Sequence, residues 1–268
     1  MTAPLLITRR QHIALITLNR PDTRNALSGE AMFSAFESLV DELNADLSVR
    51  AAVLTGAGTA FCSGGNVAEM RDRTGMFAGS PEEITERYRQ GIQRIPRALA
   101  RLQVPLIAAV NGPAIGAGND LACMCDLRIA SSTARFAESF VKVGIIPGDG
   151  GCWLLPRVVG HAKAAELALT GDTIDAEEAL RIGLVSRVVS PDELLPEALK
   201  LAGRIAANPP QVLRWTKQLL QQARTGTLDE ALDAAGRLQG LAHHTADHAE
   251  AVAAFFEKRA PVFSGGAA

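Results

Sequence analysis

The stretch Asn111-Gly112-Pro113-Ala114-Ile115-Gly116-Ala117-Gly118-Asn119-Asp120 decides the fold of this chain, and it follows the apolar residues 106–110. A second glycine-rich stretch, Phe61-Cys62-Ser63-Gly64-Gly65-Asn66, stands about fifty residues earlier, after the apolar residues 51–54. The pattern predicts a turn after a buried strand in both places, and a helix after the second turn. Such turns expose backbone N–H groups, and two turns brought together direct two donors at one oxygen. Loss of one such donor typically costs about 3 kcal/mol of transition-state stabilisation.

Predicted strands and helices alternate around these turns. Strands are predicted at residues 5–8, 12–18, 51–54, 106–110, 127–130 and 185–189. Helices are predicted after an N-cap at Ser28, from 81 towards 102, and at 121–125, 150–157, 161–169 and 175–182. Residues 71–80 have mixed charge and small side chains, which predicts a mobile loop. The alternation favours an α/β core over residues 1–190, whereas residues 191–268 are predicted to be almost entirely helical.

Composition excludes several classes of protein. The chain has 268 residues, of which 47% are hydrophobic and 21% are charged, so it can bury a sizeable core. Its net charge of −2 gives no reason to expect nucleic acid or an anionic membrane as a partner. No apolar run approaches the about 20 residues of a membrane helix. The first residues lack the features of a signal peptide, so we expect a cytoplasmic protein.

The cysteines and histidines predict no metal site. Cys62, Cys123, Cys125 and Cys152 follow no C-x-x-C spacing. A reducing compartment and buried thiols explain them better than a metal or a redox pair. The histidines near the C-terminus, among them His244 and His248, have no carboxylate-rich surroundings in the sequence, and we expect an exposed polar helix face there.

Further motifs extend along most of the chain. They are Asn-Arg-Pro-Asp-Thr-Arg-Asn-Ala-Leu at 19–27, Cys-Asp-Leu-Arg-Ile-Ala at 125–130, Gly-Ile-Ile-Pro-Gly-Asp-Gly-Gly at 144–151, Leu-Pro-Arg-Val-Val-Gly at 155–160 and Glu-Lys-Arg-Ala-Pro-Val-Phe at 257–263. With both glycine turns, and in this order, they resemble the enoyl-CoA hydratase/isomerase family, also called the crotonase superfamily. The resemblance implies a spiral of ββα units over residues 1–190. It also implies that residues 191–268 assemble the chain into a homotrimer or a dimer of trimers.

The resemblance also implies a site for an acyl-CoA thioester. The family's two oxyanion donors match the backbone N–H groups of Ser63 and Ala117. Arg24 and Ala26, together with Phe61, Cys62, Gly64 and Gly65, match its coenzyme A contacts, and Lys258 and Phe263 match C-terminal residues that reach the ligand, often from a neighbouring subunit. For Arg24 a solvated turn arginine is an equal alternative, and Lys258 and Phe263 can equally pack an interface.

The acid and base groups depart from the family pattern. Its hydratases hold a water between two glutamates; the first matches Asp120 and the second matches Phe140, which carries no proton. Glu138 is a neighbouring acid that replaces the second glutamate only if the turn is displaced. The two-carboxylate machinery of hydration is therefore incomplete, and Asp120 itself is equally explained as a polar residue in the first turn of its helix.

Another acid, Asp149, lies in the loop 144–151. Several isomerases of the family keep a catalytic aspartate there, at the position that matches Gly148, one residue earlier. With Trp153 to Arg157 and the chain's end, this context is most similar to ring-1,2-epoxyphenylacetyl-CoA isomerases and other bacterial enoyl-CoA isomerases. Moving a double bond requires one carboxylate and no positioned water. The alternative explanation of Asp149 is an N-cap before the next helix.

The sequence therefore predicts an enoyl-CoA isomerase, in which Asp149 or Asp120 moves a proton while the oxyanion donors hold a thioester enolate. No cofactor is expected beyond the coenzyme A part of the substrate. Three alternatives stay open: an enoyl-CoA hydratase of the β-oxidation type, a hydrolase or dehalogenase with Asp149 as nucleophile, and a non-catalytic acyl-CoA-binding protein.

Two other site types do not match the motifs. Leu121 stands where the third glycine of G-x-G-x-x-G belongs, so the second turn is not a dinucleotide fingerprint. Ser63 lies in Cys-Ser-Gly-Gly and not in the G-x-S-x-G of many hydrolases. The acyl group is expected among apolar side chains such as Met70, Met76, Phe77, Phe140 and Trp153, which core packing would explain as well.

Overall fold

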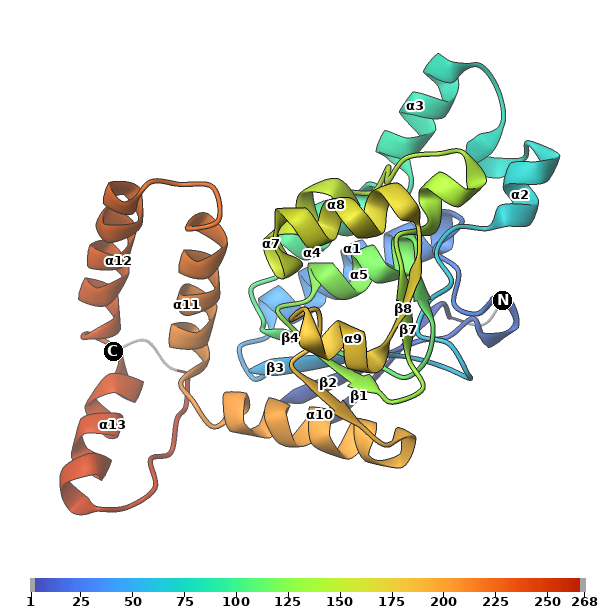
Figure 1. The fold of residues 1–268 in the computed structure, drawn as a ribbon. Helices are drawn as coiled ribbons and strands as arrows, with labels where there is room; N and C mark the ends of the chain where they lie inside the picture. Colours follow the sequence, from blue (N-terminus) through green and yellow to red (C-terminus); the bar gives the residue numbers. More distant parts are fainter. Residues whose placement is uncertain (1–2, 266–268) are drawn as a thin grey trace.

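A six-stranded sheet in the order β1-β2-β3-β4-β6-β9 forms the centre of the molecule (Figure 1). Its strands are β1 (Leu5–Arg10), β2 (Ile13–Leu18), β3 (Ala51–Gly56), β4 (Leu106–Val110), β6 (Leu127–Ser131) and β9 (Arg187–Val189). The computed structural model describes residues 3–265; residues 1–2 and 266–268, which the predicted N-terminal and C-terminal regions include, lie outside the described residues. The pair β1·β2 is antiparallel and the other pairs are parallel, which confirms the predicted α/β class.

The described residues also form thirteen α-helices. They are α1 (Glu30–Ala45), α2 (Val67–Asp72), α3 (Pro81–Gln90), α4 (Arg94–Ala100), α5 (Ala117–Met124), α6 (Gly151–Leu154), α7 (Pro156–Val159), α8 (His161–Thr170), α9 (Ala176–Arg181), α10 (Pro191–Ala206), α11 (Pro210–Gln222), α12 (Leu228–Ala242) and α13 (Ala246–Glu257).

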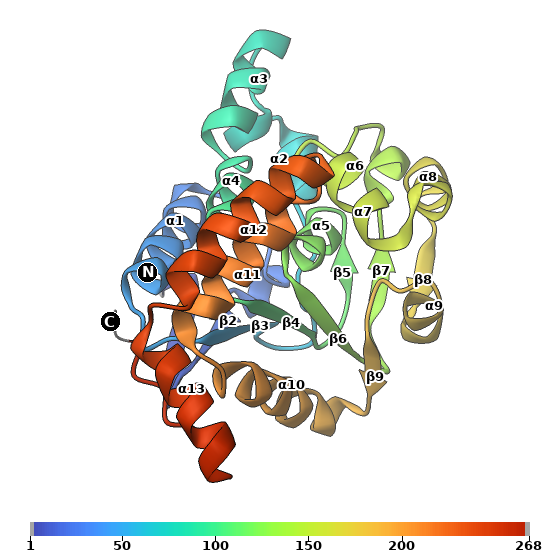
Figure 2. The same ribbon diagram turned by 90° about the vertical axis from the view of Figure 1, so that its left-hand side faces the viewer.

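Alternating side chains of the strands build two cores. Ile16 and Leu54 lie on the face that packs against α1, α4 and α5. Leu15 and Val53, their neighbours in sequence, lie on the opposite face and pack against α10, because successive side chains of a strand point to opposite faces. The helix α10 therefore covers the sheet (Figure 2), although the predicted boundary at residue 190 assigns it to the C-terminal region.

A small second sheet, in the order β5-β7-β8, places the second glycine turn. Its strands are β5 (Ala114–Ile115), β7 (Arg135–Ala137) and β8 (Thr173–Asp175). The strand β5 connects the end of β4 to α5, and the N–H of Gly116 donates to the carbonyl of Ala137 over 2.8 Å. This sheet therefore fixes the start of α5 on a rigid support.

Several predicted boundaries were wrong. The helix α1 is capped by Gly29 without a side-chain hydrogen bond, and not by Ser28. The helix predicted from 81 towards 102 divides into α3 and α4 at Gly91, where a β-carbon would lie 2.5 Å from the carbonyl oxygen of Arg87. The loop predicted at 71–80 contains the end of α2 and the short 3-10 helix η2 (Gly75–Phe77).

The last three helices extend away from the sheet, and α11 packs along α12 (Figures 1 and 2). The run predicted at 228–258 is two helices, because Thr245 caps α13 by accepting a hydrogen bond from the N–H of His248. Large apolar side chains of α12 and α13 are exposed: Leu228, Leu232, Leu241, Val252, Phe255 and Phe256. No helix of residues 3–265 has the length and apolar character needed to cross a membrane.

Candidate active site

Backbone hydrogen bonds join the two glycine turns. Cys62 and Ala114 form a parallel β-bridge. The N–H of Cys62 donates to the carbonyl of Pro113 over 3.1 Å, and the N–H of Ile115 donates to the carbonyl of Cys62 over 3.0 Å. The structure thus brings together the two turns that the sequence singled out.

Glycine is required where the turns touch. A β-carbon on Gly118 would lie 2.0 Å from the carbonyl oxygen of Cys62. One on Gly64, whose φ is +83°, would lie 2.5 Å from the carbonyl oxygen of Ile115 and 3.2 Å from the nitrogen of Ala117. Such contacts exclude any side chain, so both glycines allow the close approach of the two backbones.

Two backbone N–H groups at this junction have no acceptor among residues 3–265. The first belongs to Ala117, which begins α5 after Gly116 at φ 54° and ψ −121°. The second belongs to Gly65 in the first turn. The first N–H groups of a helix are normally unpaired, and the helix dipole adds positive potential there. These two amides are available to an oxygen atom of a ligand.

The donor role predicted for Ser63 does not fit this geometry. Its N–H already donates to the carbonyl of Arg24 over 2.9 Å, and its hydroxyl donates to the carbonyl of Thr23. Arg24 adopts a left-handed conformation with φ 52°, within a turn that lies against the first glycine turn. The free amide belongs instead to Gly65, which the sequence placed among the coenzyme A contacts.

Asn25, which the sequence analysis did not single out, ties this segment to the first glycine turn. Its buried side chain donates to the carbonyls of Ala57 and Ala60, both over 2.9 Å, and accepts from the N–H of Arg20. The N–H of Leu27 also donates to the carbonyl of Gly64. The place of Asn25 in the Arg-Asn-Ala-Leu motif was the sequence feature that could have indicated this structural role.

The predicted coenzyme A contacts fall in two separate regions. Arg24 is exposed and Ala26 is buried beside the first turn, whereas Phe61 and Cys62 are fully buried and offer no side-chain surface to a ligand. Lys258 ends α13, and the carbonyl of Phe263 accepts a hydrogen bond from the side chain of Arg50 over 2.6 Å. Helix α13 lies at the opposite end of the molecule from α2 and α3 (Figures 1 and 2).

Some of the apolar side chains expected around an acyl group lie beside the glycine turns. A β-carbon on Gly65 would lie 3.1 Å from the Cε of Met70 and 4.0 Å from the ring of Phe77. One on Gly116 would lie 3.5 Å from the ring of Phe140. The aromatic ring of Phe140 therefore occupies the space next to the start of α5.

Three carboxyl groups are buried together near these turns. Asp120 lies in the first turn of α5, Glu138 follows β7, and Asp149 precedes α6; their exposed fractions are 0%, 1% and 4%. Both oxygens of Asp120, Oε2 of Glu138 and Oδ2 of Asp149 are buried and have no hydrogen-bond partner among the described residues. The other oxygen of Glu138, Oε1, accepts a hydrogen bond from Asn119 over 2.8 Å.

The pKa values of all three carboxyl groups are raised. Burial is the largest cause for each, because it disfavours the charged form. The charges of Asp149 and Glu138 raise the pKa of Asp120 further, to well above its usual range. The proximity of Asp120 lowers the pKa of Glu138 and of Asp149 and so opposes part of the effect of burial. The cluster therefore binds protons more firmly than exposed carboxyl groups would, and Asp120, whose pKa is raised well above its usual range, binds one most firmly.

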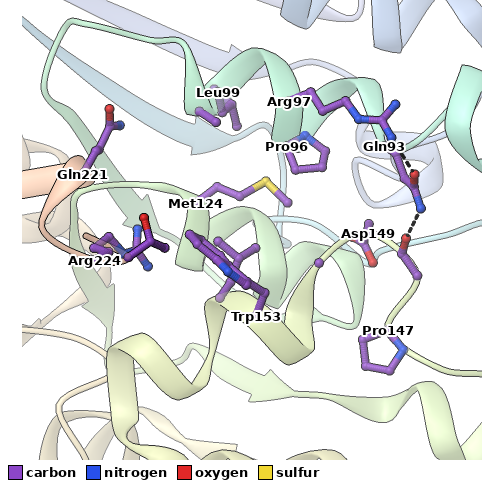
Figure 3. A pocket seen from close by; sticks show the side chains of 15 residues that line it. Gln93, Pro96, Arg97, Leu99, Met124, Pro147, Asp149, Trp153, Gln221 and Arg224 are labelled. Atoms are coloured by element: carbon purple, nitrogen blue, oxygen red, sulfur yellow. Dashed lines mark hydrogen bonds between the residues drawn. The ribbon is translucent and has the colours of Figure 1, made fainter. Parts of the chain in front are cut away.

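Asp149 lies at a cavity of about 580 Å³ (Figure 3). It is the one of the three carboxyl residues that lines this cavity within the described part of the chain. It does not cap the next helix, because the N-cap of α6 is Gly150 and no side-chain cap is formed. The loop that carries Asp149 is also bonded to Gln93, whose side chain donates to the carbonyl of Gly148 over 2.8 Å. The alternative explanation of Asp149 as a cap is therefore wrong.

No group of three or more His, Cys, Asp or Glu residues within residues 3–265 is arranged to hold a metal ion. Cys62, Cys123 and Cys125 are buried, and burial raises the pKa of each thiol to about 12. Cys152, expected to be buried, is exposed.

The chain is similar to known proteins over nearly its whole length. The family model described as enoyl-CoA hydratase/isomerase matches residues 8–266. A probable enoyl-CoA hydratase of Mycobacterium tuberculosis is 41% identical over 97% of both chains. The 1,2-epoxyphenylacetyl-CoA isomerase of Escherichia coli is 39% identical over 94% of this chain and 95% of its own. A crystal structure of an enoyl-CoA hydratase from Bacillus anthracis has a TM-score of 0.91 at 32% identity, and covers 98% and 100% of the two chains.

Proposed function

Because the chain belongs to the enoyl-CoA hydratase/isomerase family, we propose that it moves the double bond of an enoyl-CoA thioester, with Asp149 as the base. The fold is the crotonase fold of its structural relatives, and the named relatives are hydratases and isomerases that act on coenzyme A thioesters. The choice of isomerisation rests on the position of the carboxyl groups.

The thioester oxygen would lie between the N–H groups of Ala117 and Gly65. Both amides are free, they come from turns that are bonded to each other, and the start of α5 adds its dipole. Donors fixed in this way stabilise the negative charge that develops on the oxygen of an enolate. Gly65 replaces Ser63 in this proposal, since the amide of Ser63 is occupied.

The observation that carries the proposal is that Asp149 faces the cavity while Phe140 lies beside the start of α5. Hydration needs a water held between two carboxyl groups, and an aromatic ring cannot hold it. Isomerisation needs one base. The carboxylate of Asp149 removes a proton from C2 of a 3-enoyl-CoA, and the electron pair moves onto the thioester oxygen as a dienolate. The protonated Asp149 then returns the proton to C4, which leaves a 2-enoyl-CoA.

Asp120 and Glu138 would set the protonation of Asp149. Asp120, the group of the cluster with the most strongly raised pKa, would hold the proton, and its presence lowers the pKa of Asp149 against the effect of burial. The pKa of Asp149 nevertheless remains raised. A base of this kind exchanges protons with a weak carbon acid more effectively than an ordinary carboxylate.

A second candidate function is hydration. Glu138 lies next to Asp120, so the chain does contain two neighbouring carboxyl groups, and several relatives are named hydratases. Both groups are completely enclosed, which separates them from the cavity. The two functions are distinguished by incubation with a 3-enoyl-CoA and a 2-enoyl-CoA. An isomerase converts the 3-enoyl-CoA into a conjugated thioester, whose absorbance appears. A hydratase adds one water to the 2-enoyl-CoA, so the absorbance of the conjugated thioester disappears and the mass rises by that of one water.

The proposed chemistry requires no metal and no redox cofactor beyond the coenzyme A part of the substrate. We also expect a homotrimer or a dimer of trimers. The exposed side chains of α12 and α13, such as Val252 and Phe255, support association with further copies of the chain. The helix α13, which ends at Lys258, lies at the opposite end of the molecule from α2, which follows the first glycine turn (Figures 1 and 2), so a ligand contact from Lys258 or Phe263 would be made in a neighbouring subunit.

A further inference from the structure

The cavity at Asp149 extends between the core and α11. Its walls are apolar, with Pro96 and Leu99 from α4, Met124 from α5 and Leu154 from α6. Asp149 lies on one side and Arg224 on the other, with Met124 and Trp153 between them (Figure 3). A ligand held at Asp149 by its reacting end would therefore direct its other end towards Arg224.

The guanidinium of Arg224 has no ion-pair partner among the described residues, although the charge of Asp126 lies near it. The guanidinium also makes no hydrogen bond to these residues and stacks on the ring of Trp153, 4.9 Å from the centroid. Arg157 stacks on the same ring at 4.0 Å. The nearby acid, Asp126, is already paired with Lys217 over 2.7 Å and with the N–H of Leu106.

The surroundings of Arg224 disfavour its positive charge. Arg224 is an exposed residue at the rim of the cavity, and partial burial is the largest cause of its lowered pKa, followed by the like charges of Arg157 and Arg128, while the charge of Asp126 raises it. Arg97, another arginine at the cavity, is in a different position: its guanidinium donates to the carbonyl of Arg89 and to the side chain of Gln93. Arg224 is therefore the guanidinium of this cavity whose hydrogen-bond donors are available to an anionic ligand.

We infer that Arg224 binds a carboxylate at the far end of the acyl chain, so that the preferred substrate is an ω-carboxyacyl-CoA thioester. The apolar walls accept the methylene groups of such a chain, and the stacking on Trp153 holds the guanidinium ready for a bidentate contact. The inference rests on the proposed function, because it takes the cavity to hold the acyl group. A phosphate of coenzyme A is the other source of an anion at this position.

The test compares two 3-enoyl-CoA thioesters of equal length, one ending in a carboxylate and the other in its methyl ester. We expect kcat/KM to be about tenfold or more higher for the carboxylate, which is the usual size of a charge-assisted hydrogen bond. Arg224→Gln should reduce this ratio to about one. Arg157→Gln is the matched control, because Arg157 stacks on the same ring without lining the cavity, and it should keep the ratio.

Calorimetric binding of the saturated analogues separates this inference from the proposed function, since it needs no turnover. A preference for the carboxylate that Arg224→Gln abolishes would support the inference even for a protein that isomerises nothing. Equal affinity of the wild type for both analogues would overturn it. An equal loss of affinity for free coenzyme A in Arg224→Gln would also overturn it, because the bound anion would then be a phosphate.

Discussion

The carboxyl group of Asp120, in the first turn of α5, is buried together with that of Asp149, which precedes α6, and each group shifts the pKa of the other. Asp120 lowers the pKa of Asp149, while the charge of Asp149 raises the pKa of Asp120. Two carboxyl groups buried together do not readily ionise together, because each negative charge disfavours the other. This pair therefore behaves as one acid and one base with unequal roles, which is the arrangement that proton transfer requires.

Replacement of the base should stop the reaction without preventing binding. In Asp149→Asn we expect kcat to fall by about 100-fold or more, which is the usual contribution of a positioned base. The affinity for a saturated acyl-CoA should change little, because the free amides of Ala117 and Gly65 are retained. Stopped-flow absorbance and calorimetry measure the two quantities. Full turnover by this variant would refute the assignment.

The acid limb of the pH profile should reveal the environment of Asp149. Because its pKa is raised, kcat/KM should fall with decreasing pH at a value above the about 3.9 of an ordinary aspartate. In Asp120→Ala the group that lowers the pKa of Asp149 is lost, so the limb should move to higher pH. Tyr88 and Cys62 also lie close to Asp149, and both have raised pKa values, which keeps them neutral in this range. An unchanged limb in Asp120→Ala would contradict the shared proton.

The carboxyl cluster should also make stability depend on pH. Between the unfolded values near 4 and the raised folded values, the folded chain binds more protons than the unfolded chain, so the free energy of unfolding falls as the pH rises. Glu138→Gln removes one of these groups and should reduce that fall. Its gain in stability over the wild type should appear near pH 7 and vanish below pH about 4.

Urea denaturation at fixed protein concentration, repeated across this pH range, measures the effect. Glu177→Gln, at an exposed carboxylate, is the control and should leave the slope unchanged. The same slope in Glu138→Gln and the wild type would show that Glu138 takes no part in the cluster.

The contact between the two turns should not tolerate a side chain. In Gly118→Ala the new methyl group would meet the carbonyl of Cys62, which must shift and displace the free amides. We expect a loss of at least 1–3 kcal/mol in stability, by the usual cost of overpacking, together with a large fall in kcat. In α10, Gly203→Ala meets nothing within 4 Å and should be neutral or stabilising by up to about 1 kcal/mol. Chemical denaturation and kinetics of both variants provide the comparison.

The sequence predicted the framework because the framework is local. The strand at 106–110 was predicted with its observed bounds, since all five of its residues are buried and apolar. Gly64 and Gly118 could also be singled out locally, because each lies in a glycine-rich stretch after an apolar run. The break between α3 and α4 was missed because it depends on contacts of Gly91 with Arg87 and the ring of Phe33.

The details of the site depend on contacts between distant segments. Whether the amide of Ser63 or that of Gly65 is free is decided by the carbonyl of Arg24, which no local pattern reveals. The grouping of Asp120 with Glu138 likewise results from the packing of α5 against the segment after β7. Composition and spacing identify the candidate acidic residues, but they cannot show which of these residues faces the cavity.

The most direct test of the central claim is turnover of cis-3- and trans-3-enoyl-CoA in deuterated water, followed by mass spectrometry and absorbance. The one-base account predicts a conjugated 2-enoyl-CoA that has incorporated deuterium and has gained no water. Stoichiometric addition of water, or binding without any conversion, would contradict it.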